Sequence, residues 1–178
     1  MANNYAMQGY DKENMARAIG RSLPISFKFG VEICNFIRNK SVNDAKKALS
    51  DAIEHDHAIP FRRFNTNLGH KRKIGPGRYP EKAAMAILDL INSAEANAQF
   101  KGLNTSKLII THIITNKGPK VMHAGRKRSR KAKRINVEIV VQEKILDKKS
   151  GASAANKDAK SQEKEIKQGK KQDGKDKK

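Results

Sequence analysis

The sequence predicts an α+β fold, in which three helices are followed by two strands that pair as an antiparallel β-hairpin with a long, outward-projecting connection. Two observations predict this fold. Apolar residues recur at the helical period of about 3.6 in three segments before residue 102, and at the strand period of two in two later segments. About twenty residues join the two later segments, far more than a tight hairpin turn needs.

The first elements lie before residue 40. Residues 15–22 fit more than one kind of element, an edge strand among them. A helix is then expected to begin with Ser26 as its N-cap and to end near Asn39. Its apolar face carries Phe29, Ile33, Phe36 and Ile37.

Two further helices have recognisable start signals. Ser41 and Asp44 resemble a capping box, and the stripe that follows comprises Val42, Ala45, Leu49, Ala52 and Ile53. Pro80 suits the first turn of a longer helix, where Glu81 is favoured by the helix dipole and Gly102 is a natural terminator. The inward stripe of this helix comprises Ala84, Ile87, Leu88, Ile91, Ala94 and Ala98. Its alanines would allow a sheet or another helix to approach closely.

Alternation with a period of two marks the two strands of the hairpin. In residues 108–115 one face is expected to carry Leu108, Ile110, His112 and Ile114. In the second strand the corresponding residues are Ile135, Val137, Ile139 and Val141. Strands adjacent in sequence most simply pair antiparallel, which predicts a hairpin over about residues 107–145.

Charge dominates the composition. The chain carries 38 Lys+Arg against 18 Asp+Glu, a formal net charge of +20, which indicates a polyanionic partner. One cysteine excludes an intramolecular disulfide framework and a Cys-based zinc cluster. The N-terminal segment lacks the apolar stretch of a signal peptide, and no apolar run is long enough to span a bilayer. A cytoplasmic protein is therefore expected.

Composition also divides the chain. Residues 148–178 contain 11 Lys and 5 Asp+Glu with one large aliphatic residue, Ile166. Such a segment buries too little apolar surface to offset the entropy of ordering, so we expect a disordered tail after one domain spanning residues 1–147. The tail is either an electrostatic arm on a polyanion or a solubilising segment, and the sequence leaves both open.

The connection between the two strands is the most basic part of the chain. Residues 117–134 hold nine Lys+Arg and no acid, so they must project into water or toward phosphates. We expect an RNA-binding hairpin tip, since Arg and Lys pair with phosphate. The alternative is a disordered basic loop or a targeting signal, although Gly118-Pro119 and the flanking strands favour a positioned element. The cations are Lys117, Lys120, Arg126, Lys127, Arg128, Arg130, Lys131, Lys133 and Arg134.

A second basic cluster lies between the second and third helices. Its cations are Arg62, Arg63, His70, Lys71, Arg72, Lys73 and Arg78. They alternate with Phe61, Phe64 and Tyr79, which either stack on unpaired bases or pin the loop to the core. Gly75-Pro76-Gly77 is expected to be a turn and does not form a phosphate-binding loop of the Walker type.

No catalytic or metal site is predicted. His55 and His57 flank Asp56, but adjacent helical residues point in different directions, so the two rings would not converge. His112 lies on an apolar strand face, and Cys34 lies among aliphatic residues as a small packed hydrophobe. We therefore expect no enzyme, no cofactor, no metal and no small-molecule substrate.

Four sequence blocks, in this order, resemble the universal large-subunit ribosomal protein family numbered twenty-two in bacteria and seventeen in eukaryotes. They are IPFRRFN (59–65), GRYPEKAA (77–84), SAEANAQFKGL (93–103) and ITHIITNKGPKV (110–121). The resemblance covers roughly residues 10 to 145. The first two blocks resemble the archaeal and eukaryotic branch, because bacterial members lack most of the loop that contains them.

The resemblance implies an α+β fold, with three helices packed on a small antiparallel sheet and one long protruding β-hairpin. It also implies a structural rRNA-binding protein of the large ribosomal subunit. In the family, the globular part binds rRNA near the opening of the polypeptide exit tunnel and the hairpin lines the tunnel. The implied partners are rRNA, neighbouring ribosomal proteins and the nascent polypeptide. Lys28 matches a basic family position and is added to the expected RNA-binding residues.

Two other functions remain open on the residues alone. One is a non-ribosomal nucleic-acid-binding protein, which has the same charge requirements. The other is binding to an anionic membrane, which would need an amphipathic helix with an exposed apolar face. The expected helices are committed to a core, so no membrane partner is expected.

Overall fold

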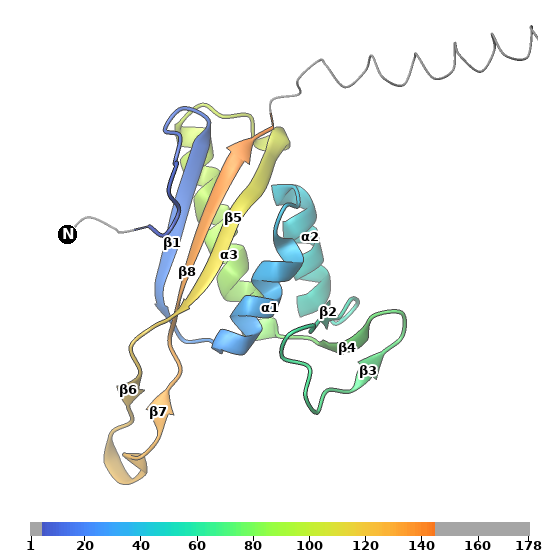
Figure 1. The fold of residues 1–178 in the computed structure, drawn as a ribbon, viewed down its shortest axis with the longest axis vertical. Coiled ribbons are helices and arrows are strands. Elements are labelled where there is room, and N and C mark those ends of the chain that lie inside the picture. Colours follow the sequence, from blue (N-terminus) through green and yellow to red (C-terminus); the bar gives the residue numbers. More distant parts are fainter. Residues whose placement is uncertain (1–4, 145–178) are drawn as a thin grey trace, which may run out of the picture. The chain divides into compact units, whose positions relative to one another are not determined.

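A three-stranded antiparallel sheet organises the protein in the computed structural model, which describes residues 5–144 (Figure 1). Its strands are β1 (Met15–Leu23), β5 (Leu108–Lys117) and β8 (Ile135–Glu143), in the order β1-β8-β5. The segment that the sequence left ambiguous is therefore an edge strand, and the predicted antiparallel pairing of the hairpin arms is confirmed. The predicted tail at 148–178 lies outside the described residues.

Three helices cover one face of the sheet, as predicted. They are α1 (Phe27–Ile37), α2 (Val42–Ile53) and α3 (Glu81–Phe100). Figure 1 shows α3 behind β1 and β8, with α1 and α2 on the side of β5. Residues between the helices and the sheet form one apolar core rich in isoleucine, with Ile33, Ile37, Ile87, Ile91, Ile110 and Ile139 fully buried.

The three helices begin within a residue or two of their predicted starts, but not every predicted N-cap residue makes a capping hydrogen bond. Ser41 accepts a hydrogen bond from the backbone N–H of Asp44, which is the predicted N-cap. Ser26 occupies the N-cap position of α1, but its side chain makes no capping hydrogen bond. Pro80 is the N-cap of α3 and lies one residue before the first turn. Gly102 has φ +77 and ends that helix as predicted.

Small side chains bring α3 close to the sheet. Ala84, Ala94 and Ala98 are fully buried on α3, and Ala16 and Ala18 are buried on β1. Leu90 is buried as well, which the predicted stripe did not include, whereas Leu88 is only partly buried against the core. The expectation that alanines permit a close approach is confirmed.

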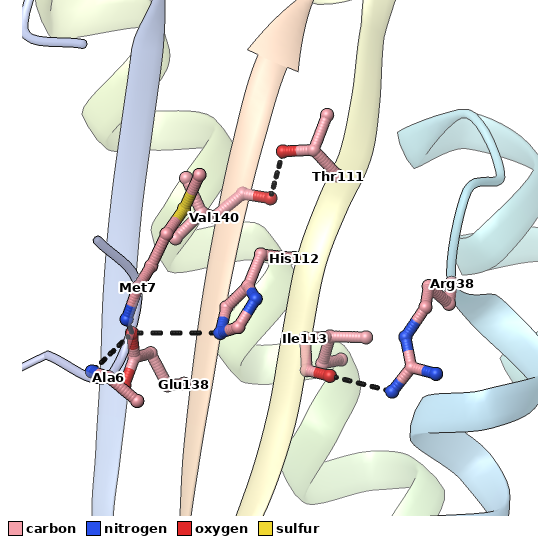
Figure 2. A network of polar contacts seen from close by, with 8 residues as sticks. All are labelled: Ala6, Met7, Arg38, Thr111, His112, Ile113, Glu138 and Val140. Carbon is pink, nitrogen blue, oxygen red and sulfur yellow. Dashed lines mark hydrogen bonds and ion pairs between the residues drawn. The ribbon is translucent and has the colours of Figure 1, made fainter. Parts of the chain in front are cut away.

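The predicted inward face of β5 is wrong beyond Ile110. A β-bulge at Thr111 adds one residue against β8, and the alternation then reverses, so Ile113 and Thr115 are buried against the helices. His112 and Ile114 therefore lie on the opposite face of the sheet. In Figure 2 the Thr111 hydroxyl donates to the carbonyl of Val140, 3.4 Å away, at the bulge.

The hairpin continues beyond the sheet. The strands β6 (Val121–Met122) and β7 (Lys131–Ala132) pair antiparallel. Between them and the sheet, the backbone N–H of Gly118 donates to the carbonyl of Arg134. A hydrogen bond from His123 to Arg130 closes the tip, which contains a 3-10 turn at Gly125–Lys127. Figure 1 shows this segment extending away from the helices. The basic connection is thus a positioned hairpin.

The loop between α2 and α3 also contains strands. They are β2 (Ile59–Pro60), β3 (His70–Lys71) and β4 (Gly75–Arg78), in the order β2-β4-β3. The prediction that Gly75-Pro76-Gly77 is a turn is wrong, because these residues form the central strand and the turn lies at residues 72–74. Gly77 allows the close approach of β2, since an added Cβ would make a tight contact, 3.3 Å from the carbonyl oxygen of Ile59.

Candidate nucleic-acid interface

A buried carboxylate organises the start of the basic loop. Glu32 lies on the inner face of α1 and is 2% exposed. Its two oxygens accept hydrogen bonds from the backbone N–H groups of Arg62 (3.1 Å), Arg63 (2.8 Å) and Phe64 (2.7 Å). The three N–H groups are turned inward onto one carboxylate, and both arginine side chains are exposed to solvent. The sequence analysis did not identify Glu32.

Aromatic side chains fix the same loop to the body. Phe61 is 2% exposed and packs edge-to-face on Phe29, with 5.5 Å between ring centroids. The interpretation that Phe61 pins the loop to the core is therefore confirmed. Tyr79 is half-buried and stacks on the ring of His55 at 4.8 Å. Phe64 is also half-buried, but it contributes to the groove described below.

All the predicted cations of this loop are exposed. Arg62 and Arg63 follow β2, and the others lie on the β3–β4 hairpin and its turn: His70, Lys71, Arg72, Lys73 and Arg78. The Lys71 Nζ lies 5.1 Å from the centre of the Tyr79 ring, and the Arg78 guanidinium lies 5.8 Å from that of Phe29. The charged groups of these two side chains thus lie near aromatic rings while the residues stay exposed to solvent.

A groove joins the start of α1 to the base of the hairpin. It has a volume of about 380 Å³, and Phe27 and Phe64 form its apolar floor, with ring centroids 6.4 Å apart. The cations that line it are Lys28, Lys117, Lys120, Lys133 and Arg134. Figure 1 shows α1 beginning beside the point where β5 and β8 continue into the hairpin. Side chains from three separate segments thus meet in one place.

Arg134 differs from the other groove cations. It is half-buried, and its Nη1 donates to the backbone carbonyl of Ser22 at 3.2 Å. Its Nε is buried without a hydrogen-bond partner among the described residues. Arg134 therefore ties the hairpin to the end of β1 as well as contributing charge to the groove.

The remaining predicted cations lie at the tip, away from the groove. Arg126, Arg128, Arg130 and Lys131 are exposed, and the side chain of Lys127 lies outside the described part of the structure. Val121 and Met122 are also exposed there, at 56% and 57%. The tip therefore offers apolar as well as cationic contacts.

The cations of these surfaces lack acidic partners. Within residues 5–144, the one Lys or Arg that forms an ion pair with a carboxylate is Lys46, whose partner is Glu95 on α3. None of the predicted RNA-binding side chains that the structure describes is paired in this way. Their charge is therefore available to an external polyanion.

A second buried glutamate lies on the outer face of the sheet, and the sequence analysis missed it too. Glu138 on β8 is 4% exposed and accepts backbone N–H groups from Ala6 (2.9 and 3.1 Å) and Met7 (3.2 Å). Figure 2 shows His112 facing the same carboxylate, with Nε2 3.9 Å from it. This cluster holds the N-terminal segment on the sheet, in agreement with a structural role for His112.

The other residues considered for catalysis or metal binding, Cys34, His55 and His57, also have structural surroundings. Burial raises the pKa of the Cys34 thiol from 9.0 to about 11, and its Sγ lies 2.9 Å from the Thr115 hydroxyl. His55 contacts Glu81 at 2.6 Å, whereas His57 lies 3.8 Å from Asp51, so the two rings do not converge. Among residues 5–144, no three His, Cys, Asp or Glu side chains are placed to hold a metal ion. No helix in that range is long and apolar enough to cross a membrane.

Comparison with known proteins decides the family. The profile of the family described as "Ribosomal protein L22p/L17e" matches residues 18–142, which span all three helices and all of the hairpin except the last residue of β8. The chain belongs to this family. Membership confirms the resemblance in the sequence, and it confirms that the chain is not an enzyme, since the family is one of ribosomal proteins.

Curated proteins similar to this chain include three from archaea. The protein named "Large ribosomal subunit protein uL22" of Archaeoglobus fulgidus is 44% identical over 118 residues, which are 65% of this chain and 76% of that protein. Proteins of the same name are 50% identical over 109 residues in Methanocaldococcus jannaschii (60% of this chain, 70% of that protein) and 40% identical over 147 residues in Thermoplasma volcanium (77% and 98%). The predicted archaeal and eukaryotic type is therefore confirmed.

Proposed function

We propose that this chain is a structural protein of the large ribosomal subunit, in the cytoplasm, and that it binds rRNA through the basic loop and the hairpin. Its globular part would lie near the opening of the polypeptide exit tunnel, and the hairpin would line the tunnel. Its partners would be rRNA, neighbouring ribosomal proteins and, at the tip, the nascent polypeptide. The curated relatives are large-subunit proteins by name, which supports the assembly part of this proposal.

One observation carries the RNA-binding part. The described cations of both basic segments form no ion pair with an acid of residues 5–144, and every one except Arg134 is exposed. An unpaired cation pairs with a phosphate without first breaking an ion pair, and each such contact releases counterions from the nucleic acid. The anchors Glu32 and Phe61 hold the loop in place before RNA binds, which lowers the entropy lost on association.

The salt dependence of binding tests this mechanism. For each phosphate neutralised, log K should fall by about 0.7–0.9 per unit of log salt concentration. Replacing residues 119–133 by Asn-Gly would close the hairpin with a two-residue turn between Gly118 and Arg134, which already pair through Gly118 N–H and Arg134 C=O. This change removes seven Lys+Arg. We expect the domain to stay folded and the salt slope to decrease by up to about 5 to 6.

The controls separate folding from binding. Circular dichroism should show unchanged helix content in the shortened protein, and loss of helix would show that the tip belongs to the core. Affinity for rRNA that barely changes with salt in the full-length protein would refute the mechanism.

Sedimentation tests the ribosomal assignment against a free nucleic-acid-binding protein. On a sucrose gradient of cell lysate, the full-length chain should co-sediment with the large subunit and remain there at moderate salt. A free nucleic-acid-binding protein would stay near the top of the gradient or follow other nucleic acids. The shortened variant provides the comparison, because it should associate with the subunit less completely.

A further inference from the structure

The groove at the base of the hairpin combines its cations with an apolar floor of two aromatic rings in mutual contact. Phe27 and Phe64 meet there edge-to-face, and both are only half-buried. The Lys117 Nζ lies 5.4 Å from the centre of the Phe27 ring, and the Lys28 Nζ lies 5.7 Å from that of Phe64. A surface that binds only phosphates has no need for such a floor, because phosphate contacts require cations and N–H donors alone.

The groove also has the charge that a nucleotide requires. Its lining contains five Lys+Arg and no acidic residue. The first turn of α1, which opens onto it at Ser26, contains no acid, and the Ser26 side chain does not cap the helix. The positive end of the helix dipole therefore adds to the lysines. The volume of the groove, about 380 Å³, is within the range of small-ligand sites.

We propose that this groove receives one unpaired nucleotide of the RNA, with its base against Phe64 and Phe27 and its phosphates held by Lys28, Lys117, Lys120 and Lys133. A paired base inside a duplex cannot reach an aromatic floor, whereas a bulged or looped base exposes its π-face for stacking. The site therefore selects single-stranded or bulged positions over continuous helices. This inference rests on the proposed RNA binding and adds a preference that phosphate contacts alone do not produce.

The test compares three RNAs of equal length with the full-length protein. One is a hairpin with a single bulged adenine, the second has an abasic residue at the bulge, and the third is fully paired. The bulged and abasic RNAs share the same backbone and charge, so their difference reports the base alone. We expect the adenine bulge to bind at least about fivefold more tightly than the abasic bulge, which corresponds to the lower limit of about 1 kcal/mol for stacking of one base on an aromatic ring.

Variants locate the preference in the groove. Phe64→Leu should abolish the difference between adenine and abasic bulges, and Phe64→Tyr should retain it. Phe100→Leu is the matched control, because Phe100 is 95% exposed at the end of α3 and does not line the groove. Circular dichroism of each variant checks that the fold persists, and the tyrosine variant keeps the test valid if the leucine variant unfolds.

The outcomes are distinct. Equal affinity of the wild-type protein for adenine and abasic bulges would overturn this inference and leave the proposed function intact. A preference that survives Phe64→Leu in a folded protein would also overturn it, because the base would then stack elsewhere. Failure to bind any of the three RNAs at low salt would instead refute the proposed RNA binding itself.

Discussion

Replacing Glu32 by glutamine tests whether one buried carboxylate holds the RNA-binding loop. The side chain keeps its size, but one acceptor oxygen becomes an NH₂ group that faces a backbone N–H. The amide oxygen can still accept from Arg63 and Phe64, whose N–H groups share one carboxylate oxygen, whereas the bond from Arg62 is lost. A hydrogen bond to a charged group contributes about 1.5–3 kcal/mol, and the two bonds that remain lose their charge assistance.

We therefore expect Glu32→Gln to lower the free energy of unfolding by about 2–4 kcal/mol, a large part of the 5–15 kcal/mol typical of a domain. Urea unfolding followed by circular dichroism at pH 7 measures the change. Amide hydrogen exchange at Arg62, Arg63 and Phe64 should accelerate in the variant. Affinity for rRNA should fall as well, because both arginines lose their fixed positions.

Glu95→Gln is the matched control on another helix. Glu95 pairs with Lys46, and the two side chains are 18% and 28% exposed. A partly exposed ion pair of this kind contributes about 0–1 kcal/mol. If Glu32→Gln cost no more than Glu95→Gln, or left the three amides as protected as before, the carboxylate would not be the anchor of the loop.

Two further predictions concern stability. Because burial raises the pKa of Cys34 from 9.0 to about 11, the thiolate forms first in the unfolded chain, and stability is lost as pH rises from about 9 to 11. At pH 10.5 this loss is about 2 kcal/mol relative to pH 8; it should be absent in Cys34→Ala, and identical pH profiles in urea unfolding would contradict it. Ser41→Ala should cost about 0.5–2 kcal/mol through the lost cap to Asp44, whereas Ser26→Ala should be nearly neutral; equal losses in thermal or urea unfolding would contradict the assignment.

Local patterns were enough to predict the helices. The apolar stripe of α3 repeats over five turns between Pro80 and Gly102, so both ends were predicted to within a residue or two. Local patterns also predicted the charged surfaces, because a dense run of cations cannot be buried and must face solvent in any fold. The exposed side chains of the hairpin tip were therefore predictable without knowing the fold.

The bulge at Thr111 was not predictable in this way. Every residue from Leu108 to Ile114 except Thr111 and His112 is a large aliphatic, so either face of the strand could be buried. Pairing along both edges of β5 determines which side chains face the core. On one edge β5 pairs with β8, and on the other edge a bridge joins Ser41 to Ile109.

The groove and its anchors depend on contacts between distant segments. Lys28, Phe64 and Lys117 come from three separate parts of the sequence and meet only in the folded protein. Glu32 was visible as an acid between Val31 and Ile33, on an otherwise apolar stretch of helix. That signal indicates a buried charge in need of partners, but it does not indicate that the partners are backbone groups thirty residues away.

The use of acidic residues explains how the fold keeps its basic surfaces available. Glu32 and Glu138 are buried, and both accept hydrogen bonds from backbone N–H groups rather than from a Lys or Arg side chain, Glu32 from the basic loop and Glu138 from the N-terminal segment. A carboxylate satisfied by N–H groups stabilises the loop and leaves the neighbouring cations unpaired. Had Glu32 paired with Arg62 or Arg63 instead, RNA binding would require breaking that pair, with a loss of affinity at each contact. The placement of Glu32 therefore serves the fold and the interface together, because it positions the basic loop without neutralising the charge that the loop presents.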